Sequence, residues 1–356
     1  METIIANTDT SEHREEAVAR AVELLARGEV IALPTETVYG LAADATRPDA
    51  VLKIFEAKER PFFDPLIVHL PGFDWLERVA VADGTLVKKL VETFWPGPLT
   101  LVLPRRELVP DVVTSGLPTV AVRMSAHPVF QEVIKRFGKP LAAPSANRFG
   151  RISPTAAEHV FTELNGRIPL IVDGGATTHG IESTIVAVEN QRMRILRSGP
   201  ITPQDLIEVQ MQCWRDQGKK VTENDLKDTF RAFELSPGFQ LEAPGQLKSH
   251  YAPRTPLLLV DTAWEITFRG RAGLLASNPV PPEHSFAMVE KLSESGDLRE
   301  AAATLFAKLR RLDEAGLDAI IAERVPETGL GIAIMDRLRK AATKELPSGF
   351  PSPPSA

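Results

Sequence analysis

Short apolar runs that alternate with helical segments are the feature that most restricts the fold of this sequence. Apolar runs typical of buried strands occupy residues 30–33, 66–70, 99–103, 119–124, 140–144, 169–173, 183–188 and 193–198. Helices are expected at 14–27, 49–57, 85–94, 128–137 and 155–164, and Gly28 follows the first as a C-cap. The alternation favours an α/β sheet, interrupted by inserted loops such as the polar stretch after residue 33.

A second alternation begins near Pro256 and predicts a smaller domain. Its strands are expected at 256–261, 272–277, 285–290 and 319–325. A long helix at 297–316 has Asp297 at its N-cap and Glu300 as the N3 partner. This order favours a small parallel, Rossmann-like arrangement. The stretch "GLGIAI" (329–334) holds two of the three glycines of a dinucleotide fingerprint, but its position near the chain end favours helix–strand packing.

The length of 356 residues favours more than one domain, because a single core rarely grows so large. The expected divisions are a first α/β domain at 1–215 and a second domain at 256–346. Between them, 216–255 combines a charged stretch, read as a surface helix or excursion over 215–235, with a Pro- and Gly-rich linker. The Pro- and Ser-rich tail at 347–356 is expected to be disordered.

Composition excludes several classes of protein. The single cysteine, Cys213, rules out a disulfide framework, and with seven scattered histidines it makes a zinc cluster improbable. No apolar run reaches the roughly 18 residues of a membrane span, and the N-terminus lacks the pattern of a signal peptide, so a cytoplasmic protein is expected. A net charge of −6 argues against a surface that grips nucleic acid throughout. Phosphate-loop, HExxH and GxSxG motifs are absent from the sequence.

Cations near strand ends point to an anion site. Lys58 and Arg60 precede Pro61, and on an extended segment they would share one face and clamp an anion. Arg123 and Arg197 lie in otherwise apolar strands, where a charge must be paired or aimed into a site. Arg148 and Arg151 flank a polar loop. Any one of these cations alone could form a surface salt bridge, but together they favour a site for phosphate.

Hydroxyl and amide side chains follow the strand at 140–144 in "APSANRFGRISPT". Thr155 and Glu158 match a capping box, so a structural alternative for Thr155, and for Ser153 near it, is the cap of the following helix. Ser145 and Asn147 have no such explanation, although an Asn turn remains open. The alternatives for other polar residues are structural too: Thr35 and Thr37 could be turn residues, and His69 could be a core histidine. The Gly-rich stretch 173–186, which contains Ser183, suits close approach of the backbone to a ligand.

Seven motifs occur in an order that carries a family resemblance. They are "LPTETVYGLAADA", "KERPFFDPLIVHL", "FWPGPLTLVLP", "TVAVRMSAHP", "APSANRFGRISPT", "GIESTIV" and "ILRSGPIT". Together they resemble the YrdC-like threonylcarbamoyl-AMP synthase family. "SHYAP" in the linker and "GLGIAIMDRLRKAA" near the end resemble the long two-domain form, so the resemblance spans roughly residues 12–345.

The resemblance implies a YrdC-like twisted mixed sheet with helices, followed by a smaller Rossmann-like α/β domain. It implies a nucleotidyltransferase that makes L-threonylcarbamoyl-AMP from L-threonine, bicarbonate and ATP, releasing pyrophosphate. This is the first step of threonylcarbamoyladenosine formation in tRNA that reads codons starting with A. It also implies Mg²⁺ bound with ATP, no tightly bound organic cofactor, weak tRNA binding at most, no membrane association, and a partner transferase that accepts the product. No metal ligands can be identified from the sequence.

The resemblance also assigns residues. Lys58 and Arg60 are expected to be catalytic. The threonine site is expected to comprise Thr35, Thr37, His69, Arg123, the backbone of Ala143, and Ser183. The ATP site is expected to comprise Lys58, Arg60, Asp64, Thr119, Ser145, Asn147, Ser153 and Arg197, with His250 and Tyr251 reaching it from the linker.

The sequence departs from the family pattern at four positions. Asp64 stands where Asn is frequent, Glu59 where Gly is frequent, Ser125 where Pro is frequent and Met335 where Asn is frequent. An acid beside phosphates repels them unless it helps to hold a metal ion. No cation of the clamp is lost.

Three alternatives remain open. An RNA-binding module without catalysis would bind RNA in a salt-sensitive way and need no ATP. A carbamoyl-adenylate enzyme of hydrogenase maturation would be expected to bring acylphosphatase and zinc-finger segments, which are not visible. A folded protein with a degenerate site is the third.

Overall fold

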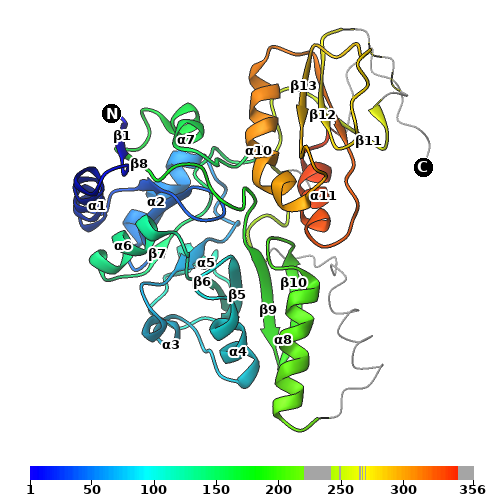
Figure 1. The fold of residues 1–356 in the computed structure, drawn as a ribbon. Coiled ribbons are helices and arrows are strands. Elements are labelled where there is room, and N and C mark those ends of the chain that lie inside the picture. Colours follow the sequence, from blue (N-terminus) through cyan, green and yellow to red (C-terminus); the bar gives the residue numbers. More distant parts are fainter. Residues whose placement is uncertain (220–241, 248–249, 264–265, 267, 269, 344–356) are drawn as a thin grey trace. The chain divides into compact units, whose positions relative to one another are not determined.

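The computed structural model of the chain describes all residues except 220–241, 248–249, 264–265, 267, 269 and 344–356. These residues form two compact units (Figure 1). The first unit comprises Met1–Phe149, Pro154–Thr178 and Glu182–Gln246. The second comprises Gly150–Ser153, His179–Ile181 and Leu247–Ala356. Two short loops from inside the N-terminal sequence therefore belong to the second unit, whereas the predicted boundaries at 215 and 255 remain predictions.

The first unit is built on one ten-stranded mixed sheet with the order β1-β8-β2-β3-β7-β4-β6-β5-β9-β10. Its strands are β1 Ile4–Asn7, β2 Ile31–Leu33, β3 Gly40–Asp44, β4 Ile67–His69, β5 Leu99–Pro104, β6 Thr119–Arg123, β7 Leu141–Ala142, β8 Leu170–Asp173, β9 Thr184–Glu189 and β10 Arg192–Arg197. Parallel pairs such as β4–β6 and β5–β9 lie beside antiparallel pairs such as β5–β6. The predicted mixed sheet is confirmed.

Helices surround this sheet and bury its two faces. They are α1 Ser11–Ala26, α2 Pro48–Lys58, α3 Leu76–Val79, α4 Thr85–Phe94, α5 Asp111–Thr114, α6 Pro128–Phe137, α7 Ala157–Leu164 and α8 Pro203–Asp216, with a 3₁₀ turn, η1, at Phe73–Trp75. Successive residues of β2 belong to different apolar clusters, because side chains alternate along a strand. Ala32 belongs to the cluster that includes residues of α2 and α4, whereas Ile31 and Leu33 belong to the cluster that includes residues of α1 and α6.

The eight strands expected in this part of the chain are present, whereas β1, β3 and α8 were not expected. The β3 sequence, "GLAAD", has mainly small residues of low strand propensity and lies in the stretch predicted to be a polar loop. Its five residues are buried between β2 and β7, so tertiary packing overrides the propensity. Helix α8 starts with a capping box formed by Thr202 and Asp205, and the excursion predicted after it lies mostly outside the described residues.

The predicted capping box of Thr155 and Glu158 is wrong. Helix α7 begins at Ala157, and Ala156 at its N-cap makes no side-chain hydrogen bond. The Thr155 carbonyl accepts from Thr177 N at 2.9 Å, and the Thr155 hydroxyl lies 3.3 Å from His159 Nδ1 on α7. Its own N–H donates to His159 Nδ1 at 3.2 Å. Thr155 therefore lies in a bend before α7 and does not cap the helix.

The second unit contains a parallel four-stranded sheet with the order β11-β14-β12-β13. Its strands are β11 Leu257–Val260, β12 Ala272–Ala276, β13 Met288–Lys291 and β14 Ala319–Glu323, and its helices include α10 Leu298–Glu314 and α11 Leu330–Ala341. Asp297 caps α10 as predicted, accepting from Arg299 N and Glu300 N. A methyl group on Gly331 would lie 1.8 Å from the Pro326 carbonyl oxygen, so this glycine serves close packing at the start of α11.

In the described part of the chain, no helix combines the length and apolar character that crossing a membrane requires.

Candidate active site

The loop between β2 and β3 presents two buried threonines with different hydrogen-bond roles. Thr35 Oγ1 accepts from the N–H groups of Thr37 and Val38 at 3.1 and 3.2 Å. Its hydroxyl donates to the Val38 carbonyl at 2.6 Å. Because a hydroxyl has one hydrogen, Thr37 must be the donor in the 2.8 Å contact between the two Oγ1 atoms. Thr35 is thus a turn residue, which is the structural alternative given for it. The Thr37 Oγ1 atom can still accept a hydrogen bond from a neighbouring residue.

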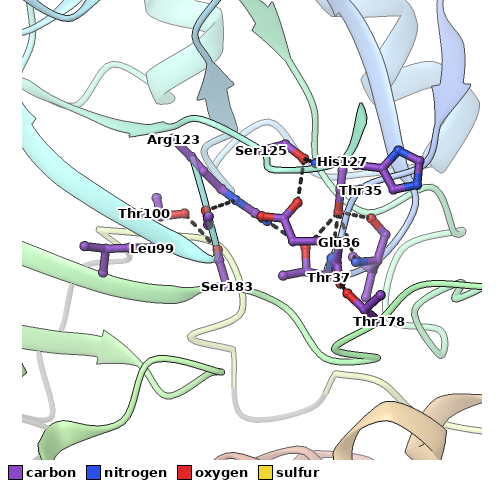
Figure 2. A network of polar contacts seen from close by, with 12 residues as sticks. Thr35, Glu36, Thr37, Leu99, Thr100, Arg123, Ser125, His127, Thr178 and Ser183 are labelled. Carbon is purple, nitrogen blue, oxygen red and sulfur yellow. Dashed lines mark hydrogen bonds and ion pairs between the residues drawn. The ribbon is translucent and has the colours of Figure 1, made fainter. Parts of the chain in front are cut away.

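That neighbour is Arg123, which ends β6 and is buried. Its Nη1 donates to Thr37 Oγ1 at 3.0 Å, and its Nε donates to the Gly97 carbonyl at 3.2 Å. Its Nη2 lies 2.7 Å from Glu36 Oε1, and Glu36 Oε2 accepts from Ser125 Oγ at 2.5 Å. Figure 2 shows the guanidinium group and the Glu36 carboxylate facing each other. Arg123 is therefore both paired and directed into a polar cluster.

Glu36 was not among the predicted site residues, although it lies between two that were. Burial raises the pKa of its carboxyl group, but the charge of Arg123 and the hydrogen bond from Ser125 more than offset this and lower the pKa to about 2. Glu36 is thus ionised at ordinary pH. An acidic residue inside an apolar stretch could have been identified by the reasoning applied to Arg123, because a buried charge requires a partner.

His69 lies in register with Arg123 across the β4–β6 pair and is buried. Burial, assisted by the charge of Arg123, lowers the pKa of its imidazole to about 3, so the ring is neutral. The ring centroid is 4.7 Å from that of Phe130. Its Nδ1 atom is buried and has no hydrogen-bond partner in the described part of the chain. His69 therefore offers a neutral polar atom next to the Arg123–Glu36 pair.

Ser183 and Arg197 form a second polar cluster with Thr100. The Ser183 and Thr100 hydroxyls are 2.8 Å apart. Arg197 donates from Nη2 to Ser183 Oγ at 3.1 Å and from Nε to the Ser183 carbonyl at 3.0 Å. Arg197, like Arg123, is a buried cation that the structure satisfies with oxygen acceptors.

The Lys58–Arg60 segment differs from its prediction as an extended strand. Lys58 is the last residue of α2, and Glu59 at the C-cap adopts a left-handed conformation with φ of 54°. The side chains of Lys58 and Arg60 therefore do not share a face in the way that residues i and i+2 of a strand do. The prediction failed because the helix extends to Lys58, and the restriction that Pro61 places on its predecessor does not reach back that far.

Lys58 is fully buried and holds the loop that follows β7. Its Nζ donates to the Ser145 carbonyl at 2.5 Å and to the Asn147 carbonyl. Burial and, next, the charge of Arg60 lower the pKa of Lys58 well below its usual value. Two predicted ATP-site residues are thus brought to Lys58 by their backbone.

Arg60 is wrapped by the residues that follow it. Its guanidinium donates to the carbonyls of Asp64 at 3.1 Å and Pro65 at 2.8 Å, and Nη2 lies 2.9 Å from Asp64 Oδ2. Burial raises the pKa of Asp64, whereas the charges of Arg60, Lys58 and Arg197 act to lower it. Three cations therefore lie within electrostatic range of one buried carboxylate, which is a suitable arrangement for a polyanion.

The remaining predicted residues of the first unit have simpler surroundings. The Ala143 N–H donates to the Ile67 carbonyl at 2.9 Å, so a ligand could use only the Ala143 carbonyl. Ser145 forms an isolated antiparallel bridge with Gly40, and Thr119 opens β6 in a partly exposed position. Arg148 pairs with Glu59 in an exposed ion pair, so its alternative as a surface salt bridge is confirmed.

Three predicted ATP-site residues belong to the second unit. Ser153 is buried there. His250 N donates to the Lys340 carbonyl at 3.2 Å, and its ring centroid is 4.2 Å from that of Tyr251. Tyr251 is 1% exposed and stacks on Phe306. Their contact with ATP stays a prediction.

The described residues were also tested for a metal site. Within them, no group of three or more His, Cys, Asp or Glu side chains is arranged to hold a metal ion. Both carboxylate oxygens of Asp64 are buried and make no hydrogen bond within the described chain, apart from the ion pair with Arg60. One such carboxylate suits Mg²⁺ that is held mainly by phosphates, because this ion often takes only one or two protein carboxylates.

Comparisons with known proteins match nearly the whole chain. The family model of Sua5, YciO and YrdC proteins, described as telomere recombination, matches residues 23–199. A model described as the threonylcarbamoyl-AMP synthase C-terminal domain matches residues 201–343. The chain is 40% identical to the threonylcarbamoyl-AMP synthase of Bacillus subtilis over 345 residues, covering 94% of this chain and 95% of the relative.

Two solved structures share the fold over nearly the whole chain. Pyrococcus abyssi Sua5 complexed with L-threonine has a TM-score of 0.80 at 35% identity, covering 96% of this chain and 98% of the other. A variant of the same protein, in which a histidine and the tyrosine after it are replaced by alanine, gives a TM-score of 0.80 at 34% identity and covers 96% of both chains.

Proposed function

Because the chain belongs to the threonylcarbamoyl-AMP synthase family, we propose a division of that enzyme's work among the residues described above. The chain is a nucleotidyltransferase of tRNA modification, and it uses L-threonine and ATP. The alternative of an RNA-binding module without catalysis is disfavoured, because relatives that match nearly the whole chain are named threonylcarbamoyl-AMP synthases. The site observation that carries the proposal is the buried Arg123–Glu36–Thr37 network beside His69.

Arg123 would bind the carboxylate of threonine. Its Nη2 is buried and makes an ion pair but no hydrogen bond within the described residues, so it retains donors for an anion. Guanidinium donors match the two oxygens of a carboxylate. His69 Nδ1 and the Ala143 carbonyl would contact the polar groups of the amino acid, with Thr35, Thr37 and Ser183 shaping the pocket.

The chemistry requires positioning more than a nucleophilic side chain. Threonine and bicarbonate form a carbamate, with loss of water and of one proton from the ammonium form. A carbamate oxygen then forms a bond to the α-phosphorus of ATP as the bond to pyrophosphate breaks. Lys58, Arg60 and Arg197 would neutralise charge on the phosphates during this displacement. Thr119, Ser145, Asn147 and Ser153 would complete the ATP site.

Asp64 would hold a magnesium ion that accompanies ATP, since its carboxylate oxygens are buried and make no hydrogen bond among described residues. When bound, the ion would offset part of the triphosphate charge. No tightly bound organic cofactor enters the proposal.

His250 and Tyr251 would contact ATP and limit access of water, which decomposes both the carbamate and the mixed anhydride. Support comes from the P. abyssi variant, whose substituted histidine and tyrosine are adjacent as these residues are. We further propose that the product passes to a threonylcarbamoyl transferase in the cytoplasm, with tRNA binding to this chain weak at most.

Pyrophosphate release by the purified chain tests the proposal, with ATP, threonine and bicarbonate each omitted in turn. Release that requires all three is the expected result. Release without threonine or bicarbonate would indicate ATP hydrolysis by another route and overturn it. If no combination releases pyrophosphate, salt-dependent tRNA binding would test the alternative of an RNA-binding module.

A further inference from the structure

Two loops from within the N-terminal sequence are structurally part of the second unit. These loops, Gly150–Ser153 and His179–Ile181, are separated in sequence from the rest of that unit by long stretches of the first. Both have buried positions: Ile152 is 3% exposed and Ile181 is fully buried. Their location therefore depends on residues of the second unit.

The first loop is held by backbone and side-chain contacts. The N–H of Ala252 donates to the Gly150 carbonyl at 2.9 Å, and Arg151 forms a parallel bridge with Ala252. Arg310, on α10 and 5% exposed, donates from Nη2 to the Ile152 carbonyl. A buried guanidinium on a long helix gives this carbonyl a fixed, charged donor.

The second loop is held by close contact with the backbone of α10. Gly180 has φ of 68°, and a methyl group on it would lie 2.3 Å from the carbonyl oxygen and 2.5 Å from the Cα atom of Ala303. Only glycine permits both this conformation and this distance. Any side chain at position 180 would push the loop away from α10.

Each loop is continuous on both sides with residues of the candidate site. The first loop begins three residues after Asn147, whose carbonyl accepts from Lys58. It ends directly before Pro154, whose carbonyl accepts from Tyr39 N. The second loop begins directly after Thr178, whose hydroxyl donates to the Glu36 carbonyl at 3.1 Å. It ends two residues before Ser183. A displacement of either loop would therefore be transmitted along a few peptide bonds to groups proposed to bind substrates.

We propose that α10 is a positioning element for the active site, acting through Arg310 on the loop 150–153 and through its contact with Gly180 on the loop 179–181. This inference rests on the proposed function, because the proposed function assigns the residues near each loop to one of the two substrates. The first loop positions the ATP-binding residues that flank it, and the second positions Ser183 in the threonine site.

The test uses full-length variants with matched controls. Arg310→Gln replaces the charged donor to Ile152 by a shorter, neutral amide, and Arg311→Gln makes the same change at the next residue of α10, whose side chain is 62% exposed. Gly180→Ala introduces the close contact. Gly138→Ala adds a methyl group at a similar positive φ of 73° where nothing lies within 4 Å. Hydrogen–deuterium exchange of the two loops and the KM for each substrate are measured for all four.

Arg310→Gln should raise exchange in residues 148–153 and raise the KM for ATP about tenfold, the effect of losing one charged hydrogen bond, with the KM for threonine little changed. Gly180→Ala should raise exchange in 178–183 and the KM for threonine by about the same factor. Arg310→Lys, which keeps a charged donor, should recover part of the ATP effect. The controls should match the wild type.

Unchanged exchange in both loops, or raised exchange with unchanged KM values, would overturn the proposal. So would equal effects on both substrates together with a general loss of thermal stability, because these would indicate a folding defect. If the wild type itself forms no threonylcarbamoyl-AMP, the proposed function fails, while exchange still decides whether α10 holds the loops.

Discussion

At the scale of single residues, the candidate site is a set of buried charges, each satisfied in a different way. Arg123 pairs with Glu36, Arg197 donates to Ser183, and Lys58 donates to backbone carbonyls. The rule that a buried charge requires a partner identified Arg123 and Arg197 from the sequence, whereas Lys58 was identified by its place before Pro61. It could not identify their partners, because Glu36 and Arg123 are 87 residues apart in the chain.

Glu36→Gln should weaken threonine binding by removing the charge that orients the Arg123 guanidinium. The KM for threonine should rise about 10- to 100-fold while the KM for ATP changes little. The free energy of unfolding should fall by about 3 kcal/mol, because a buried cation loses its partner. Steady-state kinetics and denaturant unfolding measure the two effects. Ser125→Ala keeps the ion pair between Glu36 and Arg123 and serves as the control. An unchanged KM for threonine in Glu36→Gln would show that Glu36 has only a structural role.

Lys58→Met and Arg60→Ala should each reduce adenylate formation by about two orders of magnitude or more, because they remove charge that neutralises the phosphates. Methionine is preferred to alanine at position 58 since it retains apolar volume in a fully buried place. Loss of the donors to the loop after β7 should lower the free energy of unfolding by about 1–3 kcal/mol. Pyrophosphate release measures the activity, and normal turnover in either variant, with its fold intact, would contradict the assignment.

His69 should make stability depend on pH. Its pKa is about 3 in the folded state and near 6.5 when unfolded, so between these values the unfolded state binds more protons and stability is lost as pH falls. For this one group the slope is at most about 1.4 kcal/mol per pH unit. Denaturant unfolding between pH 7 and 5 should therefore show a steeper fall for the wild type than for His69→Gln. Parallel curves would mean that His69 is not buried in its neutral form. Burial also lowers the pKa of His127, which should leave some slope in the variant.

At the scale of elements, helix ends and strands of small residues differ most from the sequence-based expectations. The end of α2 is an example: Lys58 closes the helix and Glu59 takes a left-handed conformation that glycine adopts without strain. A preference for Gly at this position, which the family resemblance implies, fits this conformation. Here the glutamate forms exposed ion pairs with Arg148 and Arg167, which offset part of the strain.

Glu59→Gly should be close to neutral in stability, because relief of strain compensates for two exposed ion pairs. Glu59→Ala loses the same pairs but keeps the left-handed conformation, so it should be about 1 kcal/mol less stable than the glycine variant. Thermal unfolding of the two variants side by side measures this difference. An alanine variant as stable as the glycine variant would show that residue 59 is not held at positive φ.

At the scale of the whole molecule, the structural units are not contiguous in sequence. The first unit has its own apolar clusters, which include α8 residues such as Leu206 and Val209. A cut after Pro200 would remove this helix and damage the first unit itself. A cut after Gln246 follows the structural division, and it keeps Glu242, which pairs with Arg194.

Truncation after Gln246 should leave a cooperatively folded protein with weaker use of ATP and a shorter-lived threonylcarbamoyl-AMP. The loops 150–153 and 179–181 would lose their partners, and His250 and Tyr251 would be absent. Circular dichroism and pyrophosphate release compare the truncated and full-length proteins. If the truncated protein matches the full chain in ATP KM and in product lifetime, the second unit has no role in the reaction.

The sequence by itself determined the alternation of strands and helices, the presence of two domains, and the residue types that suit a phosphate and amino-acid site. These follow from periodicity and from the cost of burying charge, which are local properties. Only the tertiary structure decided that "GLAAD" is a central strand, that Thr155 does not cap a helix, that Lys58 closes α2, that Glu36 pairs with Arg123, and that two internal loops belong to the second unit. Apart from the end of α2, each of these depends on contacts between residues far apart in the chain, which local sequence patterns do not contain.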